Sequence, residues 1–229
     1  MIEVLPGILA ENADELREKL FFPGFWQPGM TAHIDILDGT MFGATCFCDA
    51  TAVRSETAQR AVSTIPNIEL HCMVQNPIPI IEQWKSVVPE TIRAIIHAEI
   101  ERPIAPLLDA IHELGIETGV ALCPRTSPDI LNVLPQLPDR VLIMGVEPGA
   151  SGKTFLGEPI LAKIRRTRSL YPTLTIAVDG GMNAETTQFV SSAGANALVV
   201  SSAIWSANRP LDVYQHLTHS PTLPDTHDI

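Results

Sequence analysis

The chain has 229 residues, of which 45% are hydrophobic, 18% charged and 5% aromatic, and its formal net charge at pH 7 is −11. This length fits one large domain or two small ones, and the apolar share is enough to fill a core. Lys and Arg number 15 against 26 Asp and Glu and form no basic cluster, so binding to a nucleic-acid backbone is not expected.

The cysteines predict free thiols, because four in a chain of this length do not make a disulfide framework. Cys46 and Cys48 also lie closer together than the cysteines of a zinc knuckle. The first residues lack the basic segment and long apolar run of a signal peptide, and no apolar stretch reaches the roughly 18 residues of a membrane span. We therefore expect a cytoplasmic protein that does not insert into a membrane.

Apolar runs and turn residues predict strands that alternate with helices along the whole chain. Asn12 is a suitable N-cap for the first helix, Pro77 suits the first turn of the third, and Gly115 suits the end of the fourth. In chain order, we predict strand 3–9, helix 12–21, strand 32–37, helix 52–62, strand 68–73, helix 77–87, strand 91–97, helix 104–114, strand 117–122, helix 128–134, strand 140–146, helix 159–171, strand 174–178, helix 184–193, strand 197–200 and helix 211–218.

Eight strand–helix units in one chain predict the α/β class and a single (β/α)8 TIM barrel. The strands are apolar runs rather than clean alternations, as in a parallel sheet that helices cover. A doubly wound open sheet is the alternative, but eight units of similar size favour closure. We expect one domain over residues 1–218 and a flexible C-terminal tail over 219–229, which is rich in Pro, Thr, His and Asp.

Polar side chains occur at the ends of several predicted strands, where the active site of a TIM barrel lies. They are His33, Asp35, His71, His97 and Asp179. Four of them, all except His97, make a set of two imidazoles and two carboxylates that suits one divalent ion: Zn²⁺, Fe²⁺, Mn²⁺ or Co²⁺. A single buried histidine is more often structural than a ligand, but four such groups at strand ends favour a metal site.

A phosphate site is expected on the other side of the barrel mouth. Gly180 and Gly181 follow the seventh predicted strand, Ser201 and Ser202 follow the eighth, and phosphate sites in this fold often use these two loops. Each glycine pair alone is explained equally well by a turn. The loop after the sixth strand adds Gly149, Ala150, Ser151 and Gly152. This loop is not a Walker A motif, because Glu147 occupies the position of its first glycine.

Short motifs along nearly the whole chain resemble those of the ribulose-phosphate 3-epimerase family, in the same order. The most specific is His33-Ile34-Asp35-Ile36-Leu37-Asp38-Gly39, which resembles His-x-Asp-x-Met-Asp-Gly. The others are residues 6–9, 71–73, 119–124, 144–155, 178–181 and 202–204.

The resemblance implies a metal-dependent 3-epimerase that converts D-ribulose 5-phosphate to D-xylulose 5-phosphate in the pentose phosphate pathway. By resemblance, His33, Asp35, His71 and Asp179 hold the metal, and the two aspartates also form the acid–base pair. Two carboxylates on opposite faces of a planar enediolate can remove a proton from one face and return it to the other. Met73 and Met144 would cover the intermediate and exclude water, although core packing explains these two methionines equally well.

The chain departs from the family pattern mainly at positions that would contact substrate. The departures are Gly7 for Ser, Leu37 for Met, Ala44 for Asn, Cys123 for Asn, Ala150, Ser151 and Lys153 in the loop after the sixth strand, and Ser201 for Gly. They leave open an epimerase of another ketose phosphate, or a barrel that binds a sugar phosphate without catalysis. Leu37 argues against the related lyases, which resemble this barrel but carry a lysine there. A homo-oligomer is compatible with the resemblance, but no interface signal stands out.

Overall fold

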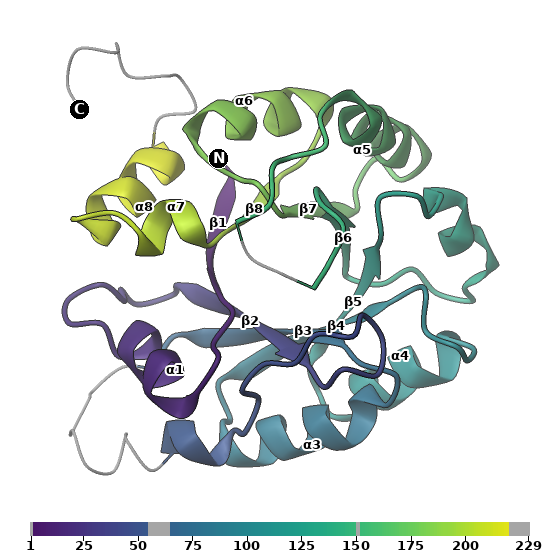
Figure 1. The fold of residues 1–229 in the computed structure, drawn as a ribbon. Coiled ribbons are helices and arrows are strands. Elements are labelled where there is room, and N and C mark those ends of the chain that lie inside the picture. The colour runs from purple at the N-terminus through teal and green to yellow at the C-terminus, as the bar shows by residue number, and fades with distance from the viewer. Residues whose placement is uncertain (1, 55–64, 150–151, 220–229) are drawn as a thin grey trace.

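The computed structural model describes residues 2–54, 65–149 and 152–219, and it shows a closed barrel surrounded by helices (Figure 1). Every neighbouring pair of strands is parallel, and β8 pairs with β1 to close the ring. The predicted TIM barrel is confirmed, and the open-sheet alternative is wrong. Closure brings the carboxyl ends of all eight strands to one mouth, although they are far apart in the sequence.

The strands agree closely with the sequence prediction. They are β1 (Glu3–Ile8), β2 (Thr31–Leu37), β3 (Asn67–Met73), β4 (Thr91–His97), β5 (Glu117–Leu122), β6 (Arg140–Met144), β7 (Thr175–Asp179) and β8 (Ala197–Val200). β6 is shorter than predicted and ends at Met144, although the N–H of the next residue, Gly145, still bonds to the carbonyl of Asp179 on β7. β7 begins and ends one residue later than predicted, so that its last residue is Asp179.

Among the described residues, the helices differ from the prediction at two places. They are α1 (Ala13–Leu20), α3 (Pro77–Val87), α4 (Ala105–Glu113), the 3-10 helix η1 (Pro128–Val133), α5 (Glu158–Leu170), α6 (Ala184–Ala193), α7 (Ser202–Trp205) and α8 (Pro210–His219). The segment predicted as a helix at 128–134 is a 3-10 helix, and α7 was not predicted. Residues 51–54 are helical, but the rest of the helix predicted at 52–62 lies outside the described residues.

Local side chains explain where the helices begin. The Asn12 side chain accepts the N–H of Glu15 at the start of α1, as its N-cap position predicted. Asn183 caps α6 in a reciprocal capping box with Thr186. These caps satisfy N–H groups that have no partner within their helix.

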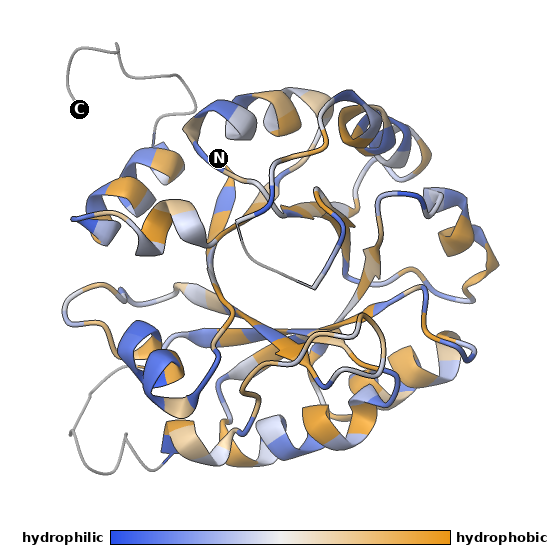
Figure 2. Ribbon diagram, viewed as in Figure 1, coloured by the Kyte–Doolittle hydropathy of each residue, from blue (hydrophilic) through white to orange (hydrophobic). Residues whose placement is uncertain are grey.

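The strand pleat divides the side chains between two cores. One face of each strand points outward and packs on apolar side chains of the helices. Figure 2 shows hydrophobic residues recurring along the helices that surround the barrel. The other face points into the barrel, where a smaller apolar cluster includes Leu5, Ile95 and Leu142. The polar residues of the mouth share this inward face, so the barrel interior supports them directly.

An ionic layer lies inside the barrel around Glu69, a fully buried residue of β3. Glu69 pairs with Arg93 at 2.6 Å and with Arg140 at 3.0 Å. Each arginine also pairs with a carboxylate nearer the solvent, Arg93 with Glu117 and Arg140 with Glu3. A buried carboxylate is costly unless it is paired and hydrogen-bonded, and the two arginines meet that need for Glu69.

Within the described residues, no helix is both long enough and apolar enough to cross a membrane. α8 runs to His219, the first residue of the predicted tail, and 220–229 lie outside the described residues. The predicted tail therefore stays a prediction.

Candidate active site and metal centre

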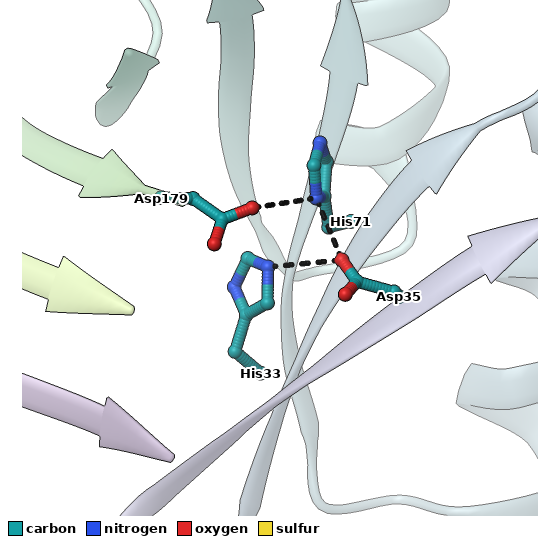
Figure 3. A group of neighbouring side chains, drawn as sticks. All are labelled: His33, Asp35, His71 and Asp179. Atoms are coloured by element: carbon teal, nitrogen blue, oxygen red, sulfur yellow. Dashed lines mark hydrogen bonds and ion pairs between the residues drawn. The ribbon is translucent and has the colours of Figure 1, made fainter. Parts of the chain in front are cut away.

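Four of the five polar residues predicted at the strand ends form one cluster at the barrel mouth (Figure 3). They are His33, Asp35, His71 and Asp179. One candidate ligand atom from each lies within 4.8 Å of those of the other three. Closure of the barrel produces the cluster, because Asp179 comes from β7 while the other three come from the adjacent strands β2 and β3.

The His33 imidazole is fully buried and its two nitrogens have different surroundings. Nδ1 lies 2.7 Å from Oε1 of Glu69. Nε2 lies 3.4 Å from Oδ1 of Asp35 and makes no hydrogen bond to any described residue. Burial lowers the pKa of His33, but the neighbouring carboxylates Asp35 and Glu69 raise it by more, to about 10. The site therefore attracts positive charge at the unpaired Nε2.

The His71 imidazole is also fully buried and connects the cluster to a fifth polar residue. Its Nδ1 lies 2.9 Å from Oδ1 of Asp35 and 3.7 Å from Oδ2 of Asp179. Its Nε2 lies 2.9 Å from Nε2 of His97. His97 is thus placed behind His71 and does not share the cluster that His71 forms with the two aspartates.

The two aspartates have opposite shifts in pKa. Burial raises the pKa of Asp35, but the neighbouring imidazoles of His33 and His71 outweigh it and hold the pKa well below its usual range. Burial and the nearby charge of Asp35 raise the pKa of Asp179 to about 6. Two neighbouring carboxylates whose pKa values are pushed apart are a common arrangement for a base and an acid.

The donor set fits a divalent cation. It combines neutral imidazole nitrogens with carboxylate oxygens, which Zn²⁺, Fe²⁺, Mn²⁺ and Co²⁺ accept. The buried Nε2 of His33 lacks a hydrogen-bond partner in the described structure, and a metal ion could bind to its lone pair. Glu69 accepts from the opposite nitrogen, which is the usual arrangement behind a metal-binding histidine.

A cleft above the cluster opens to solvent, and both aspartates of the cluster line it. Most of the predicted site residues line it: Asp35, Met73, Met144, Gly149, Gly152, Asp179, Gly180, Gly181, Ser201 and Ser202. His33 and His71 lie beneath it. Ala150 and Ser151 lie outside the described residues.

Gly7 does not line the cleft. A Cβ atom at Gly7 would lie 2.9 Å from a Val199 methyl carbon and 3.3 Å from the Ser201 Cβ, so these two residues of the β8 end fill the space that a side chain would need. The Gly7 carbonyl accepts a hydrogen bond from the indole N–H of Trp205, which holds α7 against β1. The structure therefore places Ser201, and not Gly7, beside the space above Asp179.

Sequence reasoning missed two carboxylates that support the histidines, Glu69 and Glu99. Glu99 accepts from His97 in the same way that Glu69 accepts from His33. A signal existed for both: Glu69 is two residues before His71 and therefore on the same strand face, and Glu99 follows His97 by two residues.

The fold and this cluster define a (β/α)8 barrel with a candidate acid–base and metal site at the carboxyl ends of its strands. Residues 3–205 match the model of the Ribulose-phosphate 3 epimerase family. The chain belongs to the ribulose-phosphate 3-epimerase family of isomerases, as its motifs predicted.

Individual relatives agree with this assignment. The chain is 36% identical to the ribulose-phosphate 3-epimerase of Schizosaccharomyces pombe over 124 residues, which is 54% of either chain. It is 32% identical to the cytoplasmic isoform of ribulose-phosphate 3-epimerase from Oryza sativa subsp. japonica over 192 residues, 82% of this chain and 81% of that one. A crystal structure of 3-hexulose-6-phosphate synthase matches with a TM-score of 0.59 over 95% of this chain and 98% of the other, and at 14% identity it shows the fold alone.

Proposed function

We propose that this protein is a metal-dependent 3-epimerase of a ketopentose phosphate and interconverts D-ribulose 5-phosphate and D-xylulose 5-phosphate. The observation that carries the proposal is the pairing of Asp35 and Asp179. The two carboxylates come from β2 and β7, share one cluster with His33 and His71, and have opposite pKa shifts. This proposal is consistent with the names of the relatives.

Epimerisation at a carbon beside a ketone requires a proton to leave one face and return to the other. Asp35, which is held ionised, takes the proton from carbon 3 of the ketose. Asp179, whose pKa is raised, holds a proton and delivers it to the opposite face of the planar enediolate. In the reverse reaction the two aspartates exchange roles.

His33, Asp35, His71 and Asp179 would hold the divalent cation. When bound, such a cation supplies positive charge against the oxygens of the enediolate. The cleft residues Met73 and Met144 present apolar side chains beside the aspartates, and this keeps water from the reactive carbon.

The phosphate of the substrate would bind at the end of the cleft formed by Gly180, Gly181, Ser201 and Ser202. Gly180 and Gly181 have φ angles of 105° and 72°, which side chains rarely adopt, so the backbone there can come close to a ligand. The hydroxyl groups of Ser201 and Ser202 add donors for phosphate oxygens. Gly149 and Gly152 lie across the same cleft.

The test is turnover of D-ribulose 5-phosphate by metal-free protein to which Fe²⁺, Mn²⁺, Co²⁺ or Zn²⁺ is added separately. Formation of D-xylulose 5-phosphate with at least one ion, and its loss with a chelator, supports the proposal. Absence of turnover with every ion overturns it.

Two other functions share this site. An epimerase of another ketose phosphate is favoured by the departures at Gly7, Ala44 and Cys123, and a panel of ketose phosphates separates it from the first proposal. A barrel that only binds a sugar phosphate would show binding by calorimetry without exchange of the carbon-bound proton. Action in the cytoplasm and assembly into a homo-oligomer stay predictions.

A further inference from the structure

A second group of titratable side chains lies beside His71 and has no part in the proposed proton transfer. It consists of His97 at the end of β4, Glu99 just after it, and Cys123 just after β5. His97 is buried, and the Phe42 ring lies against it with 4.9 Å between ring centroids. Glu99 and Cys123 border it on the side away from His71.

The hydrogen bonds of Glu99 determine which nitrogen of His97 carries a proton. Oε1 of Glu99 accepts the N–H of Cys123 at 2.9 Å and the hydroxyl of Thr126. Oε2 lies 2.9 Å from Nδ1 of His97. An ionised carboxylate only accepts hydrogen bonds, so Nδ1 of His97 must be the donor.

The direction of the next hydrogen bond follows from this one. A neutral imidazole has one N–H, so Nε2 of His97 is an acceptor. The 2.9 Å contact between the two Nε2 atoms needs one proton, which His71 must therefore supply. The Nδ1 atom of His71, which faces Asp35 and Asp179, is then the ring nitrogen whose lone pair a cation can use.

We propose that Glu99 and His97 are positioning residues, which fix His71 through a hydrogen-bond chain in the tautomer whose Nδ1 can bind the divalent cation. The two histidines of the metal site are then oriented by two different hydrogen-bond arrangements. His33 donates directly to Glu69, whereas His71 donates to Glu99 through a second imidazole. Both arrangements leave the second ring nitrogen facing the aspartates, where a cation can take the place of a proton.

It follows that His97, Glu99 and Cys123 cannot hold a second cation while His71 binds the first one through Nδ1. A cation on Nδ1 of His97 would force the remaining proton onto its Nε2. That proton would then face the N–H of His71 across 2.9 Å, with no acceptor between them. The chain of hydrogen bonds and a second cation therefore exclude each other.

The inference rests on the proposed metal site, but its first test does not need a bound metal. Nitrogen-15 NMR of the metal-free protein, labelled at histidine, identifies the protonated ring nitrogens. We expect His97 to be protonated at Nδ1 alone and His71 to carry a proton at Nε2. A proton on Nε2 of His97 overturns the proposal. The turnover assay above is separate, so failure of the proposed function is distinguished from failure of this inference.

The second test is the substitution Glu99→Gln, which replaces one carboxylate oxygen by an NH2 group with almost no change in the shape of the side chain. The backbone N–H of Cys123 and the hydroxyl of Thr126 continue to donate to the amide oxygen, so the amide NH2 faces Nδ1 of His97. This reverses the chain and places a proton on the metal-binding nitrogen of His71. We expect Zn²⁺ affinity, measured by competition with a chromophoric chelator, to fall about 10- to 100-fold, as is usual for substitutions behind metal ligands.

Glu101→Gln is the matched control, because Glu101 is an exposed carboxylate two residues further along the same segment. We expect its Zn²⁺ affinity to equal that of the unmodified protein. The absorption bands of bound Co²⁺ should shift in Glu99→Gln and not in Glu101→Gln, a change that a general loss of stability would not produce. Unchanged affinity and spectrum in Glu99→Gln, or two Zn²⁺ ions per chain in the unmodified protein, would contradict the proposal.

Discussion

The Nδ1 atom of His33 lies 2.7 Å from Oε1 of Glu69, and both side chains are fully buried in the barrel. Glu69 is in turn held by Arg93 and Arg140, so this histidine of the candidate metal site is supported by the ionic layer beneath it. The same carboxylate thus serves the stability of the barrel and the geometry of the site.

Glu69→Gln should therefore be strongly destabilising. It leaves two buried arginines without their shared partner, and loss of one partner from a buried ion pair costs about 3–5 kcal/mol. Urea unfolding of the metal-free protein measures the change. Glu117→Gln, at the half-exposed end of the same network, is the control and should cost less than about 1 kcal/mol. Equal losses in the two variants would show that Glu69 is not the centre of the layer.

Asp179→Asn should abolish exchange of the substrate's carbon-bound proton without unfolding the barrel. Removal of a general acid or base lowers the rate about 10²- to 10⁴-fold. Proton NMR in D2O follows the incorporation of deuterium at carbon 3. The control is Asp38→Asn, because Asp38 is exposed and its side chain only accepts from Thr40 in a turn. Continued exchange in Asp179→Asn would show that the acid–base assignment is wrong.

The stability of the metal-free protein should fall as pH rises from about 6.5 toward 10. The pKa of His33 is raised from 6.5 to about 10, so the folded state holds a proton in this range that the unfolded chain has already lost. Its stabilising contribution is complete below pH 6.5 and disappears as pH passes 10. Unfolding free energies at pH 7 and pH 9.5 measure the effect.

Protein loaded with Zn²⁺ provides the comparison for that experiment. The cation takes the place of the proton on His33, so this part of the pH dependence should vanish, and one or more protons should be released on binding. If the unfolding free energy falls equally between pH 7 and pH 9.5 with and without Zn²⁺, the pH dependence comes from titratable groups other than His33.

Lys153→Met should weaken binding of the phosphorylated substrate. Lys153 is the only described residue lining the cleft with a positively charged side chain, and its Nζ is held by the carbonyls of Glu147 and Pro148. Since the lysine is exposed, we expect KM to rise only about 3- to 10-fold, less at high salt, with kcat unchanged. Arg209→Met, at an exposed position at the start of α8, should leave KM unchanged. A fall in kcat alone would argue against a role in phosphate binding.

Gly7→Ser, which restores the serine of the family pattern, should destabilise the fold. The new Cβ would meet Val199 at 2.9 Å, and overpacking of this kind costs about 1–3 kcal/mol. Thermal unfolding of Gly7→Ser, Val199→Ala and the double variant forms a cycle. The double variant should be more stable than the sum of the single changes predicts, because alanine removes the clash. Strict additivity would show that Val199 is not what excludes a side chain at position 7.

Most of the barrel was predictable because its signals are local. Repeated apolar runs separated by caps and turn residues identify the units, as Asn12 and Gly115 illustrate. α7 was missed because a helix of four residues has almost no periodicity, and the bond from Trp205 to Gly7 that holds it joins opposite ends of the chain. The 3-10 helix at 128–133 was misjudged in type, since its sequence also suits an α-helix.

The four residues of the cluster were predictable because each ends or occupies an apolar strand, where a polar side chain is unusual. The supporting carboxylates were harder to identify. Glu69 becomes meaningful only once closure places Arg93 and Arg140 around it, and Glu99 only once the Nε2 atoms of His97 and His71 meet. Such contacts depend on strand register, which a single sequence does not specify.

The contact between positions 7 and 201 couples two departures from the family pattern. The serine of that pattern is Gly7 here and its glycine is Ser201, and a Cβ at Gly7 would lie 3.3 Å from that of Ser201. This spacing is tighter than most Cβ contacts, so side chains at both positions would crowd each other. The two positions therefore form one packing unit between β1 and the end of β8, and a substitution at one changes the space available at the other.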